Sequence, residues 1–283
     1  MLLSKYPKSI IKELKTLYKE FNKLVIKNNQ DRNGDDIKNL KNQFSLLTIE
    51  PNISIISLLL LKNNLKIKNI QKYNKVLLIT ELYLIGFTLH LNIENPKFQQ
   101  SHNKESPFSD KENIKTLQVL LGDFLFTKIF EIILSIDNKD ILELFAKYNK
   151  KISEGMLELK QLSNSNDIEK IIETYKDIYG SFFKLCFESI IILSREDTEN
   201  NADNIKLISE IKAISCYIES FFSVINIYKN IYIYNFASES IELDKLKEYL
   251  INDLYNIESH IIQNKYTKDL TNYLNNIIIR IKT

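Results

Sequence analysis

The chain has 283 residues, 44% hydrophobic and 26% charged, a composition that supports one or two globular domains with a large core. Its 38 basic and 36 acidic side chains are interleaved and leave a formal net charge of +2, so nucleic acid is not an expected partner. Glycine (5) and proline (4) are scarce, which disfavours an all-β fold and favours long helices joined by few loops.

Apolar residues recur three and four positions apart along most of the chain, which is the spacing of amphipathic helices. Met1 to Leu24 alternates Lys and Glu with aliphatic residues, so we expect a first helix there and not a secretory signal. The apolar window Val76 to Ile93 is interrupted by Glu81 and His90, which predicts a buried core helix and no transmembrane segment. The predicted helices cover residues 3–28, 36–46, 51–64, 69–94, 112–136, 138–162, 166–195, 203–231, 241–263 and 266–282.

The breaks between these helices do not divide the chain. The longest break, 95–113, contains Pro96 and Pro107, and the pattern has no repeat of fixed period, so we expect a single all-helical domain over residues 1–283. Cys186 and Cys216 both lie inside apolar helical patterns, where a thiol is usually a small buried hydrophobe. This predicts a reducing compartment and a cytoplasmic location.

One segment carries a family resemblance. Leu120 to Phe126 reads Leu-Leu-Gly-Asp-Phe-Leu-Phe before an apolar helix, and it resembles the Leu-x-Gly-Asp-hydrophobic signature of trans-isoprenyl (polyprenyl) diphosphate synthases. Similar segments follow in the family's order from about residue 44 to the C-terminus. They are Glu81 before Leu89-His90, Ile152-Ser153-Glu154-Gly155, Phe182-Phe183, and Leu270 to Arg280. The resemblance implies an all-α, isoprenoid-synthase-like bundle of about ten helices around a central cavity.

The chemistry-bearing positions of that family are altered in this sequence. Its first Asp-rich motif aligns with Leu91, Asn92 and Asn95, and its second with Asn226, Ile227 and Asn230. Its diphosphate-binding cations align with Leu47, Thr48, Glu50 and Ile178. Magnesium requires hard anionic oxygens, and a diphosphate requires cations, so we expect neither a catalytic magnesium site nor any other cofactor.

Other candidate sites favour structural roles. His90, His102 and His260 lie far apart in sequence and form no zinc-binding pair with each other. Ser153-Glu154-Gly155 lacks the context of a hydrolase nucleophile. Phe87 and Phe222 are candidates for lining a pocket for a prenyl tail, although aromatic residues at helical spacing more often pack in a core. No residue is a strong catalytic candidate.

Three functional hypotheses follow. The leading one is a non-catalytic subunit of a heteromeric polyprenyl diphosphate synthase in isoprenoid biosynthesis, because in the family the region of Phe124 to Leu134 helps form the dimer interface. Its partner would be a catalytic synthase subunit, with a homodimer as the alternative. The second hypothesis is a stand-alone protein of the same fold that binds an isoprenoid or another apolar ligand. The third is a structural helical protein of unrelated descent.

Overall fold

The computed structural model describes residues 69–91, 111–162, 167–197 and 202–228, together with separate residues between 248 and 260. These residues form helices and contain no strand. The helices are α4 (Ile70–Leu91), α6 (Lys111–Ile136), α7 (Lys139–Leu162), α8 (Ile168–Asp197) and α9 (Ala202–Tyr228).

Five predicted helices are confirmed, and their described ends lie within two residues of those expected. The last predicted residues of two of them, 92–94 and 229–231, lie outside the described residues. The predicted helices at 3–28, 36–46, 51–64 and 266–282 also lie outside them. The described residues between 248 and 260 are helical, in agreement with the helix predicted at 241–263.

Polar side chains fix where three of the helices begin. The side-chain oxygens of Asn69, Asn138 and Asp167 accept hydrogen bonds from backbone N–H groups three residues later, at 3.1, 2.8 and 3.0 Å. Such N-caps satisfy donors that the first helical turn leaves without a partner. Between α6 and α7, Asp137 takes a positive φ of 54°, a conformation that Asp tolerates better than most residues. The tight turn makes α6 and α7 antiparallel.

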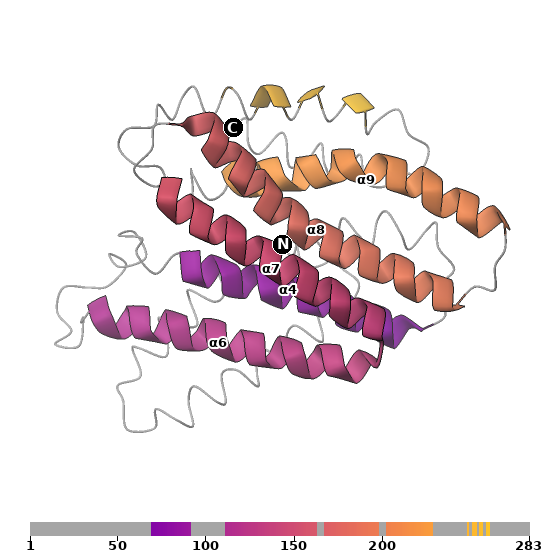
Figure 1. Ribbon diagram of the computed structural model, residues 1–283, viewed down its shortest axis with the longest axis horizontal. Helices are drawn as coiled ribbons and strands as arrows, with labels where there is room; N and C mark the ends of the chain where they lie inside the picture. The colour runs from indigo at the N-terminus through magenta and orange to yellow at the C-terminus, as the bar shows by residue number, and fades with distance from the viewer. Residues whose placement is uncertain are drawn as a thin grey trace, which may run out of the picture.

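Helix α8 is central, because it packs against α7, α9 and α4, while α4 also packs against α6. The helices alternate in direction from α4 through α9, so α4, α7 and α9 run parallel to one another, and their C-terminal ends lie at the left-hand end of the bundle in Figure 1. This topology brings the end of α4 and the end of α9, which are far apart in sequence, to the same end of the molecule.

Helix α4 is a core helix, as the sequence predicts. Within the described residues, α4 is the one helix that is long and apolar enough to cross a membrane, but 78% of its apolar stretch is buried inside the protein. Its residues Tyr83 and Phe87 meet Phe182 of α8 at ring-centroid distances of 4.8 and 5.2 Å. These edge-on aromatic contacts join α4 to α8 at the centre of the bundle.

The two cysteines differ in burial. Cys186 is fully buried in α8, as expected, but Cys216 is exposed on α9, so the prediction of a second buried thiol is wrong. The reason is helical phase. Ile214 and Ile218 are buried. Cys216 is two positions from each of them, which is about 200° around the helix, so it lies on the outward face.

Candidate functional site

The candidate site lies at the end of the bundle where α4 and α9 terminate, with α8 packed against both. The sequence assigned the first altered motif to the end of α4 and the second to the end of α9. The described positions of the two motifs, Leu91 in the first and Asn226 and Ile227 in the second, therefore lie at the same end of the fold (Figure 1).

Leu91, the first residue of the first altered motif, is the last residue of α4 and packs partly buried against the core. Asn92 and Asn95 lie outside the described residues. Just before the motif, the ring of His90 lies over Gly122 of α6. A Cβ at that glycine would be 2.2 Å from His90 Nε2. The absence of a side chain at Gly122 therefore leaves the room that His90 occupies.

The electrostatics of His90 are governed by two opposing effects. Burial lowers the pKa of the imidazole, and Asp123 partly opposes this, with its Oδ1 3.9 Å from His90 Nε2. Since burial is the larger effect, the neutral form of the imidazole is favoured over the charged form. The Gly-Asp pair that carries the family resemblance thus contacts the residue that precedes the first altered motif.

The two described positions of the second altered motif, Asn226 and Ile227, are buried. Asn226 donates its side-chain N–H to the backbone oxygen of Phe222, one turn earlier in α9, at 2.8 Å. Ile227 is completely buried in the apolar core. Asn230 lies outside the described residues. At the two described positions, one side chain is therefore hydrogen-bonded to its own helix and the other is a packed aliphatic group.

Ile178, the position assigned to the family's lysine, packs at the interface of α7 and α8. It is buried, and a Cβ built on Gly155 of α7 would lie 2.6 Å from its Cγ1. Position 155 therefore has to be small for the two helices to approach this closely. The neighbouring Ser153 and Glu154 are exposed, and Glu154 Oε1 is 3.8 Å from Lys150 Nζ. The other expected diphosphate positions, Leu47, Thr48 and Glu50, lie outside the described residues.

Phe87 and Phe222, the candidate pocket residues, are both fully buried. Tyr179 of α8 contacts both rings, with centroid distances of 5.9 Å to Phe87 and 6.3 Å to Phe222. At this level an aromatic side chain of α8 thus bridges α4 and α9. The role of Phe87 and Phe222 in lining a prenyl pocket stays a prediction.

These positions do not fit a magnesium ion. Magnesium requires near-octahedral oxygen ligands, usually with one or two carboxylates, and Leu91, Asn226 and Ile227 supply no carboxylate. Within the part of the chain that the structure describes, no group of three or more His, Cys, Asp or Glu residues could hold a metal ion. Leu91, Ile178, Asn226 and Ile227, the described positions of the altered motifs, thus offer neither an anionic ligand for a cation nor a cation for a diphosphate.

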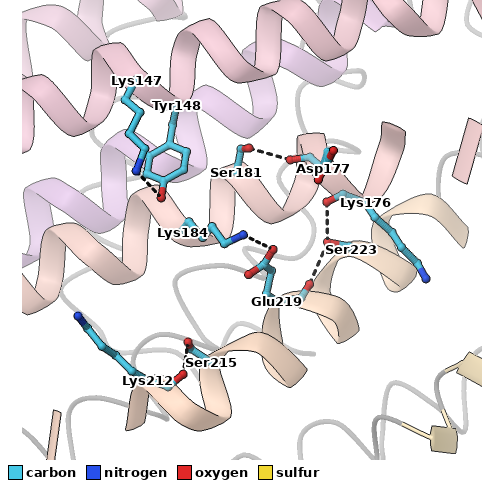
Figure 2. Close-up of polar contacts among 10 residues, drawn as sticks. All are labelled: Lys147, Tyr148, Lys176, Asp177, Ser181, Lys184, Lys212, Ser215, Glu219 and Ser223. Atoms are coloured by element: carbon cyan, nitrogen blue, oxygen red, sulfur yellow. Dashed lines mark hydrogen bonds and ion pairs between the residues drawn. The ribbon is translucent and has the colours of Figure 1, made fainter. Parts of the chain in front are cut away.

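A polar network between α8 and α9, shown in Figure 2, was not predicted from the sequence. Oε1 of Glu219 on α9 lies 2.8 Å from Nζ of Lys184 on α8. The hydroxyl of Ser223 donates a hydrogen bond to the backbone oxygen of Lys176 at 3.3 Å. A Cβ at Gly180 would come within 2.5 Å of Glu219 Oε1, so the glycine makes room for the carboxylate. Burial raises the pKa of Glu219, and Lys184 opposes that shift. Periodicity cannot reveal such pairs, because it does not specify which residues meet across two helices.

Comparison with known proteins identifies the architecture. No protein-family model matches the chain, and no curated protein matches its sequence significantly. Among solved structures, the crystal structure of an isoprenoid synthase family member from Thermotoga neapolitana aligns with a TM-score of 0.59 at 14% sequence identity. The alignment covers 87% of this chain and 92% of that one.

The chain has an isoprenoid-synthase-like fold. The all-α, isoprenoid-synthase-like architecture expected from the sequence is therefore confirmed. At 14% identity the likeness concerns the fold and leaves the activity to be argued from the residues.

Proposed function

We propose that this protein is a non-catalytic subunit of a heteromeric polyprenyl diphosphate synthase, which associates with a catalytic chain and modulates it. The observation that carries the proposal is the burial of Ile227 and Asn226 at the end of α9, where the family's second set of aspartates aligns. In an isoprenoid-synthase-like fold, that position would have to present carboxylates to metal-bound diphosphate.

The proposal follows from electrostatics. Ionisation of an allylic diphosphate develops negative charge on the leaving group, and preorganised charge at that place usually supplies the largest part of a barrier reduction. An aliphatic side chain at position 227 and an amide that donates to its own helix at 226 supply no such charge. Ile178, packed against Gly155, likewise supplies no cation for the diphosphate. We therefore infer that the chain forms part of a cytoplasmic complex in which its partner subunit carries out the catalysis.

The test is co-expression with the active polyprenyl diphosphate synthase encoded in the same genome, followed by affinity purification through a tag on this chain. A stoichiometric complex with an altered rate or product chain length supports the proposal. Absence of both a complex and any effect on the partner's products contradicts it. Retention of an isoprenoid by the purified chain alone would instead favour the stand-alone binding protein.

A further inference from the structure

A polar residue interrupts the stripe of side chains that α6 buries against the core. The aliphatic members of this stripe recur at helical spacing. They are Leu121, Leu125, Ile129, Ile133 and Ile136. Gln118 continues the same spacing by one step towards the start of the helix, and it is only 2% exposed. A polar side chain at such a position destabilises the fold unless its hydrogen bonds are satisfied.

The amide nitrogen of Gln118 has no hydrogen-bond partner. Its Nε2 is buried, and no residue that the structure describes accepts a hydrogen bond from it. Native proteins leave few buried donors without a partner, because each one loses its hydration without compensation. An apolar residue of similar size would avoid this penalty, so the glutamine needs a reason other than packing.

Gln118 lies near the end of α4, beside the candidate site. A Cβ at Gly86 of α4 would be 3.7 Å from Leu125 Cβ, and a Cβ at Gly122 would meet the ring of His90. These contacts place the two antiparallel helices level with each other. Gln118 is one turn before Gly122, about 6 Å further towards the end of α4, and four-residue spacing keeps it on the side of α6 that faces α4.

The surroundings of this amide favour an uncharged acceptor. Among the side chains that the structure describes within one turn of Gln118 on α6, none is charged. On the next turn, burial lowers the pKa of His90, which favours the neutral imidazole, and the carboxylate of Asp123 repels anions. A hydroxyl or carbonyl oxygen accepts a hydrogen bond from an amide without needing a counter-charge.

We propose that Gln118 binds a small uncharged ligand at the interface of α4 and α6, donating from Nε2 to a hydroxyl or carbonyl oxygen, while Leu121 contacts the apolar part of that ligand. The inference is separate from the proposed function, because the site belongs to the single chain and no partner enters the test. Its ligand class also differs from a diphosphate, which is strongly anionic.

The first arm of the test measures the effect of the unpaired amide on the ligand-free chain. Gln118→Met keeps a similar volume and removes the donor, so we expect it to unfold at a higher urea concentration than wild type. Leu125→Met is the matched control for placing methionine in the same stripe, and it should give no such increase. A Gln118→Met chain that is as stable as wild type or less stable shows that the chain or a structural water already satisfies the amide, which overturns the inference.

The second arm observes the amide by nuclear magnetic resonance of the full chain. The side-chain amide signals of Gln118 are assigned by their absence from the spectrum of Gln118→Met. Methyl butyl ketone and hexanol are expected to shift these signals saturably, and hexanoate, which has a similar chain and a negative charge, should bind roughly tenfold more weakly. Hexanoate that binds as tightly as the ketone, or signals that no probe shifts, would overturn the inference and leave the proposed function standing.

Discussion

The contact between Gly155 and Ile178 supports a quantitative prediction about how closely α7 and α8 approach. In Gly155→Ala, the new Cβ would lie 2.6 Å from Ile178 Cγ1 and 3.0 Å from its Cδ1, well inside van der Waals contact. Overpacking of this kind costs about 1–3 kcal/mol. Alanine gains about 1 kcal/mol over glycine within a helix. We therefore expect a net loss of about 0–2 kcal/mol in the free energy of unfolding.

Gly86 of α4 is the matched control, because it is also buried in a helix but a Cβ there meets nothing nearer than 3.7 Å. Gly86→Ala should therefore keep the helical gain of about 1 kcal/mol. Urea unfolding followed by circular dichroism measures both variants, and the two should differ by about 1–3 kcal/mol. If Gly155→Ala stabilises the protein as much as Gly86→Ala does, the reasoning is refuted.

A double-mutant cycle locates the source of the cost. Ile178→Ala alone removes buried methyl groups and should cost about 2–5 kcal/mol. Combined with Gly155→Ala, the new methyl group occupies part of the vacated space, so the double variant should be more stable than the sum of the single effects by about 1–3 kcal/mol. Additive effects would show that the two side chains do not compete for the same space.

Two further predictions concern α9. Glu219 has a folded pKa raised above its ordinary value of about 4.5, so the folded state binds this proton more tightly and stability falls as the pH rises above that value. Compared with Glu219→Gln, wild type should therefore lose stability as the pH is raised above about 4.5 in parallel urea titrations. A difference that is constant with pH would contradict the shift. Ile227→Asp should bury a carboxylate without a partner, at about 3–5 kcal/mol, and lower the melting temperature by about 10 °C. Restoration of that temperature by Mg²⁺ would show that position 227 faces a metal site.

The sequence predicted the helices well because apolar periodicity reports directly on which residues face a core. Helix α4 is an instructive case, since the apolar window interrupted by Glu81 and His90 predicted a buried core helix, and the structure packs it against α6 and α8. The exposure of Cys216 was not predicted, because the prediction considered only the apolar residues around it. Its phase relative to Ile214 and Ile218 already places it on the outward face.

The site was less predictable, because its geometry depends on contacts between helices. Nothing in the local pattern of α8 indicates that Ile178 meets Gly155 or that Lys184 meets Glu219, because these pairs depend on how the helices are offset along one another. The resemblance supplied positions for the altered motifs, and topology brings the ends of α4 and α9 to one end of the bundle.

We propose that the described positions of the altered motifs do not supply the charge needed for prenyl transfer. The most direct measurement incubates the purified chain with magnesium, radiolabelled isopentenyl diphosphate and an allylic diphosphate, alongside an active polyprenyl diphosphate synthase. We predict no chain-elongated product from this protein under conditions where the active enzyme consumes its substrate. Magnesium-dependent formation of a longer prenyl diphosphate by the chain alone would contradict the account.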